Sequence, residues 1–183
     1  MNIFLDSNVF HTDPFLEKGE KPILLRLAQH DDVKLFINET VYSEVERHHK
    51  SFLEREIKNT QDSLSKLMPF LNKEREILDL SIKLENLLGD FSDFFHELGT
   101  EEQMTIIEYD ADVLKHIVKM DMFEELPFIK QEIITNKQGN KVTKKKKEMR
   151  DSIIWYSFQE YIEKNELEYC YFISNNIKEF GAD

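Results

Sequence analysis

The chain has 183 residues, enough for one domain, and 40% of them are hydrophobic, which is enough for a substantial core. Its 36 acidic and 24 basic residues give a formal net charge of -12, so the overall field repels nucleic acid, and any such binding needs a local basic patch or metal ions. A single cysteine, Cys170, excludes an intrachain disulfide, and the absence of a secretory signal and of a membrane-length apolar stretch leads us to expect a cytoplasmic protein.

The first elements that the sequence predicts are two strands with a helix between them. Residues 3–5 are a short apolar run, typical of a parallel strand buried on both faces, which stops abruptly at Asp6. Residues 6–8 all favour turns, so a plain turn explains them as well as a functional site does. A helix over residues 22–30 begins at a proline, and residues 33–37 form the second strand.

Two long helices are expected next, over about residues 41–65 and 74–98, with a break near Pro69. Good helix formers fill both segments, and few glycines or prolines interrupt them. We therefore expect a long helical hairpin inserted at about residues 41–98, within a single domain of residues 1–183.

The remaining segments continue the alternation of strands and helices. Residues 104–109 form a third strand, 111–122 a helix, 148–164 a helix and 168–174 a fourth strand, whereas residues 129–147 are the most loop-like part of the chain. This order predicts an α/β fold, a three-layer α/β/α sandwich around a central, mainly parallel sheet.

Two carboxylates are expected on the core-facing sides of helices, where an ionised group is costly unless a positive charge meets it. Asp151 shares an apolar stripe with Phe158, in the first turn of its helix. Glu44 lies one turn from Val41 on the helix after the second strand. Simpler explanations exist, since the helix dipole favours Asp151 at an N-terminus, and Glu44 can pair with His48 on the helix surface.

Polar residues also follow the predicted strands. Asp6 ends the first strand and Asn175 and Asn176 follow the last, and the carboxyl ends of parallel strands meet at one edge of a sheet. Glu44 and Asp151 reach that edge if their helices begin there. Three carboxylates gathered in one place repel one another, and Mg2+ or Mn2+ with oxygen ligands relieves the repulsion. Such an ion activates water and clamps a phosphate for in-line displacement.

Four motifs, in this order, resemble a PIN domain. They are LDSNVF with Asp6 and Asn8, VYSEVERHH with Glu44, RDSIIW with Asp151, and FISNNIKEF near the end of the chain. The resemblance implies a three-layer PIN-like nuclease fold and a metal-dependent ribonuclease, often a toxin or defence effector. It also implies that Asp6, Glu44 and Asp151 are the metal ligands, with Ser7 or Asn8 shaping the site.

The long hairpin and the LPF of residues 126–128 resemble a bacterial PIN-like subgroup once labelled a domain of unknown function. One motif departs from the common pattern of a Ser or Thr, any residue and then an Asp, because Ser174 and Asn175 lead to Asn176. An amide oxygen still ligates a metal or positions a water, but it adds no negative charge. The chain ends soon after Phe180, where this fold usually continues, so we expect a longer protein or a shortened chain.

The leading hypothesis is an endoribonuclease that depends on Mg2+ or Mn2+ and hydrolyses RNA phosphodiesters. Its catalytic residues would be Asp6, Glu44, Asp151 and Asn176, the last as ligand or water-positioner. The residues expected to bind substrate lie at strand ends and in a basic stretch before Asp151, and they are Asn8, Ser174, Asn175, Lys144, Lys145, Lys146, Lys147 and Arg150. A solvated loop explains the lysine run equally well.

The competing hypothesis is a catalytically weak PIN-like module that binds a partner protein or nucleic acid without cleaving it. Asn176 and the acidic composition favour this alternative. The sequence leaves the partners open beyond RNA, and they include an antitoxin, further domains of a longer protein and a second copy of the chain. No membrane partner is expected.

Overall fold

A computed structural model of the chain describes residues 1–70, 83–123, 129–135, 141–147 and 149–175. In this part of the chain the central sheet has four parallel strands in the order β3-β2-β1-β6. The strands are β1 (Asn2–Leu5), β2 (Lys34–Asn38), β3 (Met104–Ile107) and β6 (Cys170–Ile173). All four were predicted, and because they are parallel, their carboxyl ends meet at one edge.

Strand β1 lies in the middle of this sheet, which explains why its sequence is apolar on both faces. Ile3, Phe4 and Leu5 are all buried. Phe4 pairs in register with Phe36 of β2 and Phe172 of β6, and its ring stacks on Phe36 with a centroid distance of 4.8 Å. The aromatic core therefore fixes the strand whose end carries Asp6.

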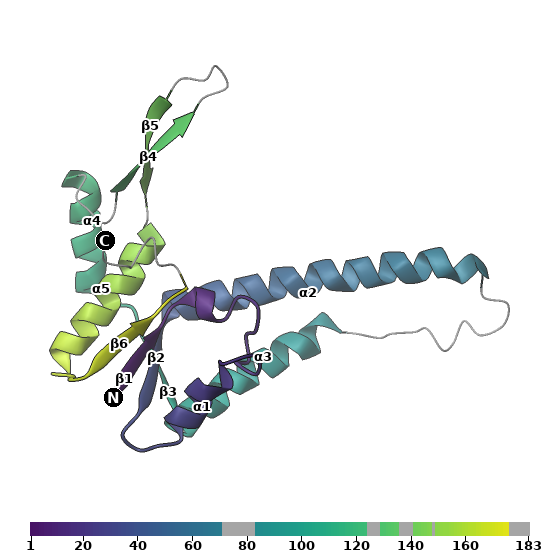
Figure 1. The fold of residues 1–183 in the computed structure, drawn as a ribbon, viewed down its shortest axis with the longest axis horizontal. Coiled ribbons are helices and arrows are strands. Elements are labelled where there is room, and N and C mark those ends of the chain that lie inside the picture. Colours follow the sequence, from purple (N-terminus) through teal and green to yellow (C-terminus); the bar gives the residue numbers. More distant parts are fainter. Residues whose placement is uncertain (71–82, 124–128, 136–140, 148, 176–183) are drawn as a thin grey trace.

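Helices cover both faces of the sheet (Figure 1). The elements α1, α2 and α3 lie on one side and α4 and α5 on the other, which confirms the predicted α/β fold with a parallel sheet flanked by helices. The helices, with two short 3-10 turns, are α1 (Pro22–Ala28), α2 (Glu39–Leu67), α3 (Leu84–Thr100), α4 (Ala111–Phe123), α5 (Met149–Lys164), η1 (Ser7–Val9) and η2 (Met68–Phe70).

The long helix α2 begins at the sheet edge and extends well beyond the sheet, as Figure 1 shows. Its first turns are anchored by buried Val41 and Val45, and α3 packs beside it through buried Phe91 and Phe95. Helix α3 begins at Leu84, and the earlier part of the predicted second helix lies outside the described residues. No described helix has both the length and the apolar character needed to cross a membrane.

Residues 129–147 correct one prediction. We expected an irregular loop, but the segment contains an antiparallel hairpin of β4 (Ile129–Thr135) and β5 (Lys141–Lys147), with Ile129 opposite Lys147 and Thr135 opposite Lys141. Backbone hydrogen bonds form such a ladder whatever the side chains are, so the lysine run did not exclude it. The predicted features at residues 126–128 and 176–180 lie outside the described residues.

Candidate functional site

Asp6 lies at the carboxyl end of β1 and caps η1, and only 4% of its surface is exposed. Its Oδ1 accepts a hydrogen bond from the backbone N–H of Ser7 at 2.7 Å. Its Oδ2 accepts one from Nδ2 of Asn8 at 2.6 Å and one from Oγ of Ser174 at 2.7 Å. Because a carboxylate has about four acceptor positions, Asp6 keeps room for a further partner.

Asn8 connects the end of β1 to the end of β6. Its Nδ2 also donates to Oγ of Ser174 at 2.9 Å, and its Oδ1 accepts from the backbone N–H of Asn175 at 2.8 Å. Nδ2 of Asn175 donates to the carbonyl oxygen of Asn8 at 3.3 Å. Three residues predicted to bind substrate are thus brought together near Asp6. Asn8 and Ser174 orient its carboxylate, and Asn175 is bonded to Asn8.

The electrostatics of Asp6 link it to Glu44. Burial is the main effect and raises the pKa of Asp6, while the hydrogen bonds from Ser174 and Ser7 lower it. The negative charge of Glu44 raises the pKa further, and His11 lowers it. Glu44 of α2 is therefore close enough for its charge to act on Asp6, although the two residues lie far apart in the sequence.

Glu44 is mostly buried, with 14% of its side chain exposed, and it is paired with two arginines. Arg150 from the first turn of α5 donates to its Oε1, and Arg47 from α2 lies at 3.7 Å from the same oxygen. Asp151 directly follows Arg150 and is half-buried. The first turn of α5, with Asp151, is therefore held beside the second turn of α2.

Asn38, the last residue of β2, explains why the two helices meet at this point. Its Oδ1 accepts from the backbone N–H of Val41 at 2.9 Å and so caps α2, as a side-chain oxygen does at a helix N-terminus. Its Nδ2 donates to the carbonyl oxygen of Ile154 in α5 at 3.3 Å. One buried amide thus sets both helix N-termini at the carboxyl edge of the sheet.

The chemistry of this site fits a hard divalent cation. Asp6, Glu44 and Asp151 offer carboxylate oxygens, which Mg2+ and Mn2+ prefer. Two buried hydroxyls, Oγ1 of Thr40 and Oγ of Ser152, make no hydrogen bond among the described residues. Thr40 lies one turn before Glu44, and Ser152 directly follows Asp151, so water held near these carboxylates would satisfy them.

The three carboxylates are not drawn into one cluster among the described residues. Their ligand atoms do not all lie within 4.8 Å of one another, the spacing that a shared ion would impose. Like charges repel at short range, and Arg150 and Arg47 neutralise Glu44 in place of a cation. Both arginines contact Oε1 of Glu44, so a bound cation would compete with them for that oxygen.

A second acidic group lies where α4 and α5 pack together. Ligand atoms of Asp110, Asp112 and Glu160 lie within 4.8 Å of one another, so these carboxylates could hold a metal ion. Lysines already neutralise them, because Lys164 pairs with Asp110 and with Glu160 at 2.9 Å, and Lys115 pairs with Asp112 at 2.8 Å. The hydrogen bond from Lys164 holds the pKa of Asp110 below its usual value.

Comparison with protein families decides the family. Residues 3–180 match the PIN domain. The chain belongs to the PIN domain family. PIN domains are typically metal-dependent nucleases that act on nucleic acids, and the parallel sheet flanked by helices agrees with a PIN-like fold. No curated protein and no solved structure matches the chain.

Sequence reasoning on this PIN domain missed the bond from Asn38 to Ile154 of α5 and the second acidic group. The available signal for Asn38 was its place at the end of a strand, which is the same signal that singled out Asp6. Asp110 and Asp112 open a helix directly after β3, but only the packing of α4 on α5 brings Glu160 to them. Asn176 lies outside the described residues.

Proposed function

We propose that this PIN domain is an endoribonuclease that depends on Mg2+ or Mn2+ and hydrolyses RNA phosphodiesters. The observation that carries the proposal is the carboxylate of Asp6, buried at the carboxyl edge of the sheet and within electrostatic reach of Glu44. A buried carboxylate whose pKa is raised by burial and by a second carboxylate is the arrangement that a cation would stabilise.

In this proposal Asp6, Glu44 and Asp151 hold the metal ion, with Asn176 as a further ligand or water-positioner. The bound ion supplies Lewis-acid chemistry and an activated water. The chain's own residues orient the reacting groups, since Ser7, Asn8 and Ser174 fix the carboxylate of Asp6. A fixed ligand favours one geometry of attack and so lowers the entropic part of the barrier.

Arg150 has two roles in the proposal. It pairs with Glu44 in the structure, and a cation at Glu44 would release its guanidinium, which is then free to bind a phosphate of the substrate. Lys144, Lys145, Lys146 and Lys147 of β5 lead into the same turn and supply local positive charge. This local charge answers the objection raised by a net charge of -12.

A metal-dependent cleavage panel tests the proposal. The parent chain is incubated with single- and double-stranded RNA and DNA in Mn2+, Mg2+ or a chelator. We expect cleavage of RNA that needs the metal, and a loss of about 100-fold or more in Asp6→Asn and Asp151→Asn, because each removes a charged ligand.

A matched control is Asp90→Asn, which makes the same change at an exposed position of α3. Circular dichroism and thermal unfolding establish that each variant is folded. Cleavage by folded Asp6→Asn and Asp151→Asn at the parent's rate would contradict the proposed site. Cleavage of DNA but not of RNA would support the proposed nuclease activity and contradict RNA as its substrate.

The pairing of Glu44 with two arginines favours a second function, a catalytically weak module that binds nucleic acid or a partner protein without cleavage. In such a module the arginines permanently replace the cation. Calorimetric titration with Mn2+ separates the two functions, because the nuclease has a binding site that disappears in Asp6→Asn, whereas the weak module has none. The family resemblance also supports a toxin or defence role with an antitoxin as partner.

A further inference from the structure

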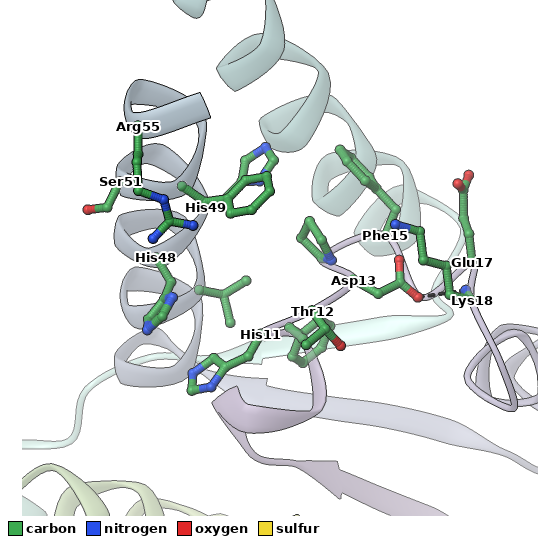
Figure 2. A pocket seen from close by; sticks show the side chains of 14 residues that line it. His11, Thr12, Asp13, Phe15, Glu17, Lys18, His48, His49, Ser51 and Arg55 are labelled. Atoms are coloured by element: carbon green, nitrogen blue, oxygen red, sulfur yellow. Dashed lines mark hydrogen bonds between the residues drawn. The ribbon is translucent and has the colours of Figure 1, made fainter. Parts of the chain in front are cut away.

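A cavity of about 690 Å³ lies next to the candidate site, between α2 and the loop that follows η1 (Figure 2). Its volume falls within the range of about 300–1,000 Å³ that is typical of small-molecule sites. Six aromatic side chains line it, and we call it the ring pocket: Phe10, His11, Phe15, His48, His49 and Phe52.

The aromatic rings of the pocket form stacked and edge-to-face pairs. His11 stacks on His48 with a centroid distance of 4.4 Å and an interplanar angle of 22°. Phe15 meets His49 edge-on at 5.8 Å. Phe52 is 50% exposed, and the guanidinium of Arg55 lies 5.4 Å from its ring centroid. A planar heteroaromatic group that enters the cavity can therefore stack on an aromatic ring and contact the guanidinium of Arg55.

The ring pocket is linked to the site around Asp6 and Glu44 through two of its histidines. His11 follows the η1 turn that Asp6 caps, and His48 lies four residues after Glu44 on α2, a rise of about 6 Å. The carboxylates of Glu44 and Asp6 both act on the pKa of His11, although burial and His48 have the larger, lowering effects. A ligand could thus occupy the ring pocket while its neighbouring phosphate lies at the carboxylates.

The ring pocket offers two basic side chains to the phosphates of a ligand with aromatic groups. Lys18 and Arg55 line the cavity, and Arg47 lies on the same helix toward Glu44. Two acidic residues, Asp13 and Glu17, also line the cavity. Oδ2 of Asp13 is engaged by the backbone N–H of Lys18 at 2.6 Å, as Figure 2 shows, and Glu17 is exposed to solvent. Cations that contact phosphates beside rings that stack on bases are the usual means of holding a single strand.

We propose that the ring pocket holds one unpaired base of a single-stranded nucleic acid, from a nucleotide that flanks the phosphate at the candidate site. The inference rests on the proposed function for the position of that phosphate. A base in a duplex cannot enter a cavity of this kind without being unpaired and unstacked. The pocket thus selects single strands and fixes the register of the strand relative to the carboxylates.

The test compares a short single-stranded RNA with a series in which one position at a time lacks its base. Affinities are measured by fluorescence anisotropy in a chelator, which prevents metal-dependent cleavage. For the parent we expect one position at which loss of the base weakens binding by about 5- to 150-fold, the range for one stacked base. In Phe52→Ala that position should show little or no penalty.

Phe70→Ala is the matched control, because Phe70 is 85% exposed and lies outside the lining of the ring pocket. It should keep the parent's penalty, and Phe52→Tyr should restore it by returning a ring. An equal penalty in the parent and Phe52→Ala, no base-dependent position, or no binding of single strands by the parent would each overturn the inference.

Cleavage assays test the proposed function independently of the ring pocket. Asp6→Asn should fail to cleave in Mn2+ and still show the base-dependent penalty in the chelator. If Asp6→Asn cleaves as the parent does, the proposed function fails, whatever the ring pocket binds. If Phe52→Ala keeps the penalty while Asp6→Asn stops cleavage, the ring pocket fails and the proposed function stands.

Discussion

His49 carries a ring nitrogen that the fold buries without a partner. Its Nε2 makes no hydrogen bond among the described residues, and the ring stacks on Phe91 with a centroid distance of 5.2 Å. Burial lowers the pKa of His49, and a backbone hydrogen bond at Leu87 only partly opposes this effect. The folded chain therefore prefers the neutral imidazole, because a proton at Nε2 would be a buried and unpaired charge.

The stability of the chain should consequently depend on pH through His49. Its folded pKa lies below the unfolded value of about 6.5, so its contribution is present above that pH and is lost as the pH falls through the folded pKa. We predict that the free energy of unfolding of the parent falls between neutral and mildly acidic pH. The free energy of unfolding of the His49→Phe variant should fall less over the same range. Urea unfolding at a series of pH values measures the difference.

The control for this prediction is His30→Asn, which changes an exposed histidine after α1. It should follow the parent, because its side chain is exposed to solvent in the folded chain. If His49→Phe and the parent lose stability in parallel on acidification, His49 is not the group that titrates.

At the scale of elements, the hairpin of β4 and β5 brings the lysine run into a defined backbone ladder. A single-stranded nucleic acid releases about 0.7 counterions for each phosphate that a cation neutralises. We predict that changing Lys144, Lys145, Lys146 and Lys147 to Gln weakens RNA binding and flattens its salt dependence. The slope of log affinity against log salt should fall by about 0.7 for each phosphate that these lysines no longer neutralise.

A second variant with the same net charge distinguishes RNA binding by the β5 lysines from the effect of the protein's overall charge. It changes the same number of exposed lysines elsewhere, namely Lys50, Lys58, Lys66 and Lys83. Its salt slope should stay near the parent's value. Equal changes in the two variants would mean that overall charge, and not the strand β5, governs the affinity.

Some secondary-structure elements of this chain could be predicted from the sequence, and others could not. The strand at Ile3 to Leu5 was predictable because a parallel strand buried on both faces needs a continuous apolar run. The β4 and β5 ladder was not, since the lysines of β5 leave it without an apolar face that would reveal its pairing with β4. Strand-end polarity therefore located Asp6, whereas strand pairing had to come from the structure.

Some features of the candidate site could also be predicted from the sequence, and others could not. Asp6 could be found from the chain alone, because it interrupts an apolar run at a strand end. The ion pair of Arg150 with Glu44 could not, since it depends on how α5 is rotated against α2. The hydrogen bond from Asn38 to Ile154 likewise could not be predicted, because the two residues lie 116 positions apart in the sequence.

The net charge of the whole chain is -12, and its described residues include the group of Asp110, Asp112 and Glu160 as well as the carboxylates around Asp6, so a divalent cation has several places to bind. Weak association with the general field occurs at many positions and stabilises the fold little. A specific site behaves differently, because an ion that binds only the folded chain adds RT ln(1 + [M]/Kd) to the free energy of unfolding. Thermal unfolding therefore reports which carboxylates hold the ion.

We predict that Mn2+ at about 100 times its Kd stabilises the parent by about 2.7 kcal/mol, which for a chain of this size raises Tm by about 5–10 °C. Asp6→Asn should lose this shift. Asp112→Asn should keep it, because Lys115 and Lys164 already neutralise the second acidic group. Both variants remove one negative charge, so a difference between them cannot arise from the overall field. A shift lost in Asp112→Asn and kept in Asp6→Asn would move the metal to Asp110, Asp112 and Glu160, and with it the position of the reaction.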